Sequence, residues 1–194
     1  MSELVKYLKQ GKLVITPTDT VYGIMADADN ENAIKKVYEV KKRSYDKPLL
    51  LLVNGIEMLN DYVEDIDDLT KQIINTYWPG TLTILFKKSS RVNKYITNNE
   101  YVAIRYPNNK IIKDTLDELG HAVVSTSANI SDSDIITKVE MIPDEILDNI
   151  AYVIDGGELS DIASTIIKVE DNRIIFLREG ILSKDIKSKF KDFI

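Results

Sequence analysis

The chain has 194 residues, of which 44% are hydrophobic and 29% are charged, with a formal net charge of −6. This composition is typical of an ordinary globular domain, and the acidic balance argues against a protein whose main partner is a nucleic-acid backbone. The absence of cysteine excludes disulfides and a cysteine nucleophile, and no stretch reaches the roughly 20 apolar residues needed to cross a bilayer. We therefore expect one cytoplasmic domain over residues 1–194, without contact to a membrane.

Strand and helix patterns alternate along the first half of the chain. Asn30 is a suitable cap for a helix that follows it, and the Pro79-Gly80 pair ends a later one. The hydrophobic pattern predicts, in chain order, a strand at 12–16, a helix over 31–42, a strand at 49–53, a helix over 69–78 and strands at 81–86 and 101–106.

The second half begins with a helical pattern that Gly120 ends, a common position for the residue after a helix. The pattern then predicts a helix over 111–119, strands at 122–126, 151–155, 164–169 and 173–177, and an amphipathic helix from Ser183. Turns at Gly156-Gly157 and Asp171-Asn172 separate the last three strands. Strands interleaved with helices predict an α/β fold, and the neighbouring strands near the C-terminus predict a mixed sheet.

Several apolar strands run directly into small hydroxyl, amide or cationic residues. These strand ends are Pro17–Thr20, Arg105, Ser125–Asn129, Gly156-Gly157 and Arg178–Gly180. Each alone is an ordinary polar turn, because Thr, Ser, Asp and Gly are common turn residues. Taken together they would form a polar concave site for a small anionic ligand, since ligands of open α/β sheets bind beyond strand ends.

A basic stretch, KKVYEVKKRSYDKP, covers residues 35–48. Cations at the end of a helix favour its dipole, which is the simple explanation for Lys41 and Arg43. The alternative is an anion site, because arginine binds two phosphate oxygens at once. Neither common phosphate-binding glycine loop is present in the sequence, and the single histidine, His121, matches no catalytic pattern.

The motifs PTDTVYG, KKRSYDKPL, WPGTLT, AIRYP, STSAN, DGG, STII and REG occur in this order between about Val14 and Gly180. In these motifs the chain resembles the YrdC family of threonylcarbamoyl-AMP synthases. The resemblance implies an open, twisted, mixed sheet flanked by helices, with a large cationic cavity. It also implies condensation of L-threonine, bicarbonate or CO2, and ATP into threonylcarbamoyl-AMP and pyrophosphate. Partner proteins of the family transfer the threonylcarbamoyl group to the tRNA adenosine beside the anticodon.

The resemblance assigns roles to particular residues. The family's four-residue catalytic signature falls on Lys41, Arg43, Ser127 and Asn129. Threonine would be held by Thr20, Arg105, Ser125 and Ser164, with the Thr18 hydroxyl on the same wall of the site. ATP would be held by Arg43, Lys47, Ser127 and Arg178, with Tyr101 near it.

The chain departs from the longer relatives at two points. Leu52 stands where they carry a histidine that helps to hold threonine, and the chain lacks their extra C-terminal domain. Mg²⁺ is implied as a companion of ATP, held mainly by phosphates and water, because the sequence offers no carboxylate cage for a metal.

Two other functions remain as alternatives. One is an RNA-binding module of the same fold with weak contact to RNA, which the net charge of −6 disfavours. The other is the related carbamoyl-transfer domain of hydrogenase-maturation proteins, which lies beside cysteine-rich zinc motifs that this sequence lacks.

Overall fold

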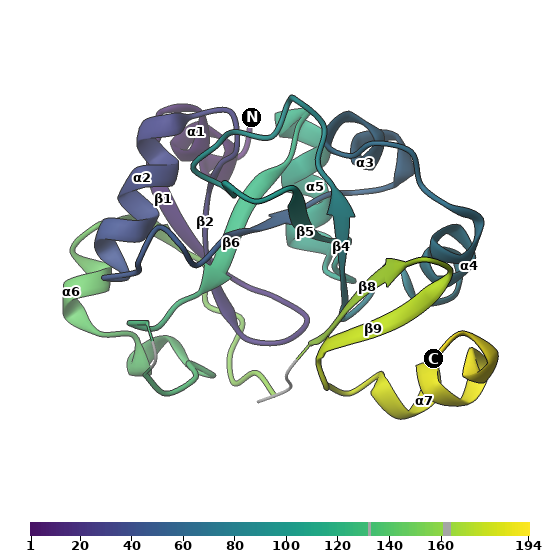
Figure 1. Ribbon diagram of the computed structural model, residues 1–194. Coiled ribbons are helices and arrows are strands. Elements are labelled where there is room, and N and C mark those ends of the chain that lie inside the picture. The colour runs from purple at the N-terminus through teal and green to yellow at the C-terminus, as the bar shows by residue number, and fades with distance from the viewer. Residues whose placement is uncertain (132, 161–163) are drawn as a thin grey trace.

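The computed structural model describes residues 1–131, 133–160 and 164–194, and within them nine strands form one sheet. Its strand order is β7-β1-β2-β6-β3-β5-β4-β8-β9 (Figure 1). The strands are β1 Leu13–Pro17, β2 Tyr22–Asp27, β3 Leu50–Leu52, β4 Leu82–Lys87, β5 Tyr101–Arg105, β6 Val123–Ser127, β7 Ile150–Val153, β8 Thr165–Glu170 and β9 Arg173–Arg178.

The helices begin and end where local signals place them. The Asn30 side chain accepts a hydrogen bond from the backbone of Ala33, and Gly120 follows its helix with φ +85°, so both predicted boundaries are confirmed. The helices are α1 Glu3–Lys9, α2 Glu31–Val40, α3 Ile56–Tyr62, α4 Asp68–Tyr77, α5 Lys110–Leu119, α6 Asp144–Leu147 and α7 Ser183–Lys189, with short 3-10 turns at Val139–Met141 and Lys191–Phe193.

Two hydrophobic clusters cover the two faces of the sheet. Successive strand residues point to opposite faces, so Leu13 and Ile15 join the larger cluster with α2, α3 and α4. Val14 between them joins the smaller cluster with α1 and α5. Ile104 and Val124 also lie in the larger cluster. The strand residues after them, Arg105 and Ser125, therefore belong to the face that carries α1 and α5.

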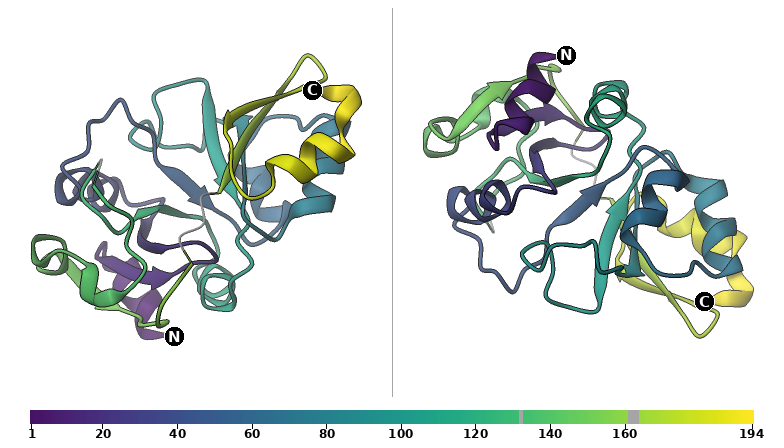
Figure 2. Two further views of the ribbon diagram at one scale, coloured as in Figure 1. Left: turned by 90° about the horizontal axis from the view of Figure 1, so that it is seen from below. Right: turned by 90° about the horizontal axis from the view of Figure 1, so that it is seen from above.

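The prediction of a mixed sheet is confirmed, because β1–β7, β3–β5 and β4–β8 are parallel and the other pairs are antiparallel. The predicted turn at Asp171-Asn172 joins β8 and β9, and both residues have positive φ. The stretch at Gly156-Gly157 is different, because β7 and β8 lie at opposite sides of the sheet. It is therefore not a hairpin turn between neighbouring strands. The N- and C-termini of the chain lie at opposite sides of the molecule (Figure 2).

Strand β2 and helices α1, α3 and α6 are absent from the sequence-based prediction. Tyr22–Asp27 contains a glycine, an alanine and an aspartate, which weaken a strand pattern, although every residue of it is buried. No helix in the described parts of the chain combines the length and apolar character of a membrane span.

Candidate active site

The loop between β1 and β2 is built around the hydroxyl of Thr18. This oxygen accepts hydrogen bonds from the backbone N–H groups of Thr20 (3.0 Å) and Val21 (3.1 Å) and lies 2.7 Å from the Val21 carbonyl. Such side-chain bonds replace a backbone turn. The Thr18 hydroxyl therefore shapes the turn, which is the ordinary explanation of this polar cluster. The hydroxyl oxygens of Thr18 and Thr20 lie 2.9 Å apart, so the turn also positions the Thr20 side chain.

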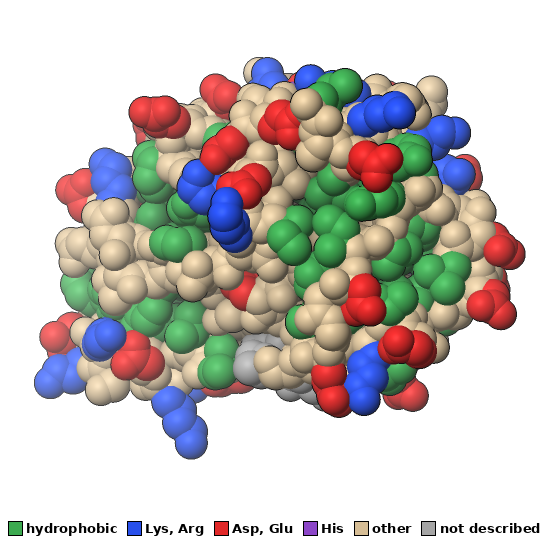
Figure 3. Space-filling view, turned by 180° about the vertical axis from the view of Figure 1, so that it is seen from behind, with side chains coloured by type: hydrophobic (Ala, Val, Ile, Leu, Met, Phe, Trp, Pro, Cys, Tyr) green, Lys and Arg blue, Asp and Glu red, His purple; other side chains and the backbone are tan. Residues whose placement is uncertain are grey.

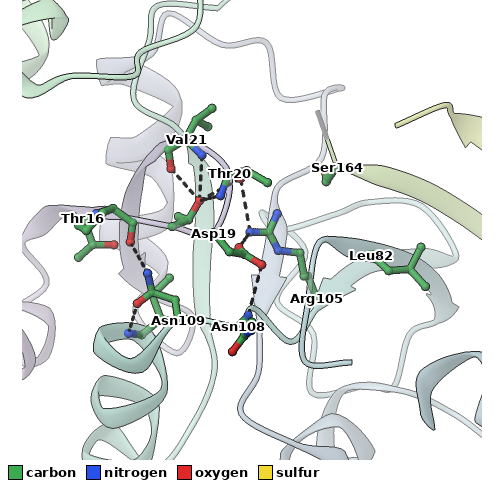
Figure 4. Close-up of polar contacts among 12 residues, drawn as sticks. Thr16, Asp19, Thr20, Val21, Leu82, Arg105, Asn108, Asn109 and Ser164 are labelled. Carbon is green, nitrogen blue, oxygen red and sulfur yellow. Dashed lines mark hydrogen bonds and ion pairs between the residues drawn. The ribbon is translucent and has the colours of Figure 1, made fainter. Parts of the chain in front are cut away.

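Arg105 and Asp19 form a buried ion pair beside this turn (Figure 4). Nη2 of Arg105 donates to Oδ1 of Asp19 and lies 3.4 Å from the hydroxyl of Thr20. Burial lowers the pKa of the Arg105 guanidinium below its ordinary value, and the charge of Asp19 opposes that shift. The structure thus brings together Thr20 and Arg105, two of the residues predicted to bind threonine. It adds Asp19, which sequence reasoning missed although it is the single carboxylate of the PTDT motif.

Ser164 and Arg178 come together at the other side of the sheet. Arg178, at the end of β9, donates to the Ser164 carbonyl (2.9 Å) and to its hydroxyl (2.5 Å). Burial lowers the pKa of Arg178, and its charge contributes to the lowered pKa of Arg105. The two guanidinium groups are therefore near enough for their charges to repel each other.

Ser125 lies on β6 and pairs with Met25 of β2. A Cβ atom added at Gly23 would stand 3.1 Å from the Ser125 hydroxyl oxygen and 3.3 Å from Cγ2 of Thr18. The glycine of PTDTVYG therefore leaves room in which Ser125 lies close to the Thr18 turn. Polar groups also lie in the interior of the protein, because Thr20, Arg105, Ser125 and Ser164 are only 4–6% exposed.

Lys41 lies directly after α2 and is buried, with 1% of its surface exposed. Its Nζ donates to the carbonyls of Ser127 (2.5 Å) and Asn129 (2.6 Å) and to Oδ1 of Asn129 (3.1 Å). The Ser127 hydroxyl bonds the same Oδ1 at 2.6 Å. Three of the four signature residues thus form one cluster. Lys41 is at the end of α2, as the helix-dipole explanation requires, but its ammonium group is not solvated, because the end of β6 covers it.

Arg43 and Lys47 lie on the connection from α2 to β3. The guanidinium of Arg43 donates to the carbonyls of Lys47 (2.9 Å) and Pro48 (2.8 Å), which closes this segment into a compact loop. Lys47 itself is exposed. Arg43 is half-buried, so both cations are at least partly accessible from the surface.

Tyr101 lies away from Arg105 and the other residues of the proposed threonine site. It begins β5 whereas Arg105 ends it, so about 13 Å of strand separates them. Its hydroxyl donates to Glu170 (3.3 Å), and the ammonium of Lys168 lies 3.8 Å from its ring centre. The geometry gives no support to its predicted contact with the nucleotide.

Leu52 pairs with Arg105 in the parallel β3–β5 ladder and is buried against α1 and α5. It therefore occupies a place next to the predicted threonine site, as expected of the position where longer relatives carry histidine. A leucine supplies packing there and no hydrogen bond.

The described residues contain no group of three His, Asp or Glu side chains that could hold a metal ion. A hollow of about 390 Å³ lies beside Asn108 and Asn109, which bond to Asp19 (3.3 Å) and to the Pro17 carbonyl (3.2 Å). A wider hollow of about 580 Å³ has acidic and basic side chains on its walls, and no predicted site residue is among them.

Comparison with known proteins defines the class to which this fold and site belong. The family described as "Telomere recombination" (Sua5_yciO_yrdC) matches residues 6–180. A Methanocaldococcus jannaschii protein that carries a provisional threonylcarbamoyl-AMP synthase name is 41% identical over 181 residues, covering 92% of this chain and 84% of that protein. The threonylcarbamoyl-AMP synthase of Bacillus subtilis is 33% identical over 92% of this chain, which spans only 52% of that protein.

Among solved structures, P. abyssi Sua5 complexed with L-threonine superposes with a TM-score of 0.88 and 32% identity, over 95% of this chain and 55% of that one. The chain therefore belongs to the YrdC/Sua5 family of threonylcarbamoyl-AMP synthases. The resemblance inferred from the motifs is confirmed.

Proposed function

We propose that this protein condenses L-threonine, bicarbonate or CO2, and ATP into threonylcarbamoyl-AMP and pyrophosphate, with the residues described above as its active site. The observation that carries the proposal is the meeting of Thr20 and Arg105 from two separate family motifs, with Ser164 and Arg178 from two more beside them. The relative whose structure holds L-threonine supports an amino acid as one ligand of such a site.

On the amino-acid side, Arg105 would bind the threonine carboxylate, since a guanidinium and a carboxylate form strong charge-assisted hydrogen bonds. The hydroxyls of Thr20, Ser125 and Ser164 would surround the threonine side chain. Burial of all four residues supports this role, because hydrogen bonds are stronger where water is excluded.

On the nucleotide side, Arg43, Lys47 and Arg178 would neutralise the phosphates, and together with Arg105 they would line the cationic cavity that the family resemblance implies. Lys41 has a positioning role, because its ammonium group fixes the carbonyl of Ser127 and the side chain of Asn129. The Ser127 hydroxyl is thereby held at the end of β6, where it would meet the nucleotide.

The chemistry needs positioning and charge neutralisation more than a nucleophilic side chain. The threonine amine forms a bond to the carbon of CO2 and loses a proton, which gives a carbamate. A carbamate oxygen then bonds to the α-phosphorus of ATP while the bond to pyrophosphate breaks. ATP enters as its Mg²⁺ complex, and we assign no protein ligands to that metal.

The product would pass to partner proteins that modify tRNA beside the anticodon, in the cytoplasm. No structural observation favours the RNA-binding alternative. On the face in Figure 3, basic side chains are interspersed with acidic ones and form no continuous basic surface of the kind that binds a phosphate backbone.

The test is to incubate the purified protein with Mg-ATP, L-threonine and bicarbonate, and to measure pyrophosphate release and threonylcarbamoyl-AMP by mass spectrometry. Both products should appear only when all three substrates are present. Pyrophosphate release that does not depend on threonine would overturn the proposal.

A further inference from the structure

The pair formed by Arg105 and Asp19 is more than a contact between two strand ends. Only 5% of the Arg105 side chain and 11% of the Asp19 side chain are exposed. The second carboxylate oxygen of Asp19 accepts a hydrogen bond from the backbone of Asn108 at 3.3 Å. Asp19 is therefore held on both oxygens, and it presents a fixed negative charge beside Arg105 and Thr20.

Arg178, the other arginine of the proposed site, has a different environment, because it lies at an exposed position at the end of β9. In the described parts of the chain, its recorded hydrogen bonds go to the carbonyl and the hydroxyl of Ser164, which are both neutral. Arg178 thus keeps an uncompensated positive charge, whereas the charge of Arg105 is balanced by Asp19.

Because Arg105 pairs with a carboxylate and Arg178 bonds to neutral groups, the two arginines should accept different ligands. A buried charge is costly unless an opposite charge lies beside it. The uncompensated Arg178 favours an anion such as a phosphate. The balanced pair does not favour a simple anion, because a second carboxylate on Arg105 would crowd the carboxylate of Asp19 and leave the site with a net negative charge.

A zwitterion avoids a net negative charge on Arg105, Asp19 and the ligand, because each of its charges meets an opposite charge of the pair. We propose that Asp19 is a specificity-determining residue that makes this site select a zwitterionic α-amino acid, with Asp19 on the ammonium end and Arg105 on the carboxylate end. The inference rests on the proposed function. Asp19 would also orient the nitrogen atom that later attacks CO2.

The unaltered protein provides the first test. Isothermal titration calorimetry in a buffer free of carboxylates compares L-threonine, (R)-3-hydroxybutyrate, which is threonine without its amino group, and L-threonine methyl ester, which lacks the carboxylate charge. Threonine should bind about 10-fold or more tightly than either analogue, since each analogue loses one charge-assisted contact. Equal binding of threonine and 3-hydroxybutyrate would overturn the inference.

The second test replaces Asp19. In Asp19→Asn the affinity for threonine should fall about 10-fold or more, while that for 3-hydroxybutyrate should rise, because the anion then meets an unbalanced guanidinium. Asp29→Asn is the matched control: it removes the same charge from a half-exposed carboxylate that pairs with Arg91, and it should change neither affinity.

The remaining outcomes separate the competing explanations. If both ligands bind more tightly to Asp19→Asn, Asp19 is only a competitor for Arg105 and the inference is wrong. If neither affinity changes, Asp19 is only structural and the inference is wrong. Should the variant fail to fold, the comparison of the three ligands on the unaltered protein decides. Failure of threonine to bind the unaltered protein would overturn the proposed function itself, and the inference with it.

Discussion

The ammonium nitrogen of Lys41 lies 2.5 Å from the carbonyl oxygen of Ser127, and so ties the end of α2 to the end of β6. Lys41 is buried, and Asn129 supplies two further acceptors. The sequence pattern around Lys41 is that of a surface cation, but in the structure Lys41 is buried and holds Ser127 and Asn129 of the proposed nucleotide site. Its replacement should affect folding and activity together.

Lys41→Met keeps the length of the side chain but leaves the acceptors of Ser127 and Asn129 without their donor. The free energy of unfolding should fall by about 1.5–3 kcal/mol, the range for hydrogen bonds to a charged group. Urea denaturation measures this change. Lys42→Met is the matched control, because the ammonium group of Lys42 forms an exposed ion pair with Glu145, and the loss of that pair should cost less than about 1 kcal/mol. Equal effects of the two variants would contradict the structural role.

Arg43→Ala should affect activity far more than stability, because the carbonyls of Lys47 and Pro48 to which its guanidinium donates belong to its own loop. If Arg43 neutralises charge in the transition state, kcat/KM should fall on the order of 10²-fold or more. The measurement is threonine-dependent pyrophosphate release, with Lys42→Ala as the control at the neighbouring position. Near-normal turnover of Arg43→Ala would show that Arg43 has no catalytic role and only shapes its own loop.

The first glycine of the DGG motif, Gly156, is required because a larger side chain would clash with Pro17. A Cβ atom at Gly156 would stand 2.7 Å from Cβ and 2.8 Å from Cγ of Pro17, and the Gly156 N–H donates to the Tyr22 hydroxyl at 2.9 Å. Gly156→Ala should therefore lower the free energy of unfolding by about 1–3 kcal/mol through overpacking. In a Pro17→Gly background, Gly156→Ala should lower the free energy of unfolding clearly less. A double-mutant cycle measured by thermal denaturation tests this difference. An identical cost in both backgrounds would rule out this clash.

His121 should make stability depend on pH. Its Nε2 lies 2.7 Å from Asp27, its Nδ1 lies 4.0 Å from Asp29, and the hydrogen bond with Asp27 raises its pKa, while the charge of Arg91 opposes the shift. Because the folded pKa lies above the unfolded value of about 6.5, the stabilisation is complete below about pH 6.5 and is lost as pH rises through the raised pKa. His121→Gln should thus be destabilising at pH 5.5 and much less so at pH 8.5. A difference in unfolding free energy that grows with pH would contradict this sign.

The amino-acid pocket should prefer threonine, then serine, then valine. The Thr18 hydroxyl bonds to the backbone of its own turn. The hydroxyls of Thr20, Ser125 and Ser164 are therefore the ones expected to hydrogen-bond the substrate hydroxyl. Valine would leave those groups unpaired, and discrimination against it can reach roughly 10⁴-fold, whereas serine loses one methyl group and should be rejected by about 10- to 200-fold. Competition assays of kcat/KM test the order. If valine is a better substrate than serine, the pocket recognises shape and not the hydroxyl.

Local sequence determined most of the helices and strands of this protein, because caps, stops and hydrophobic periods act over a few residues. Asn30 before α2 and Gly120 after α5 are examples in which one side chain, or its absence, decides a boundary. The motifs also identified the family and the residues of the proposed site, because their order and spacing along the chain carry that information directly.

Only the tertiary structure decided which distant groups meet. The sequence contained no sign that β7 pairs with β1 far from β8, that Asp19 balances Arg105, or that β6 buries Lys41. Strand order and ion pairing depend on the whole set of competing long-range contacts, and the free energy of each contact depends on the burial that the others create. For that reason the same PTDT motif contains a threonine that builds a turn, one that faces Arg105, and an aspartate whose charge acts on a strand more than 80 residues away.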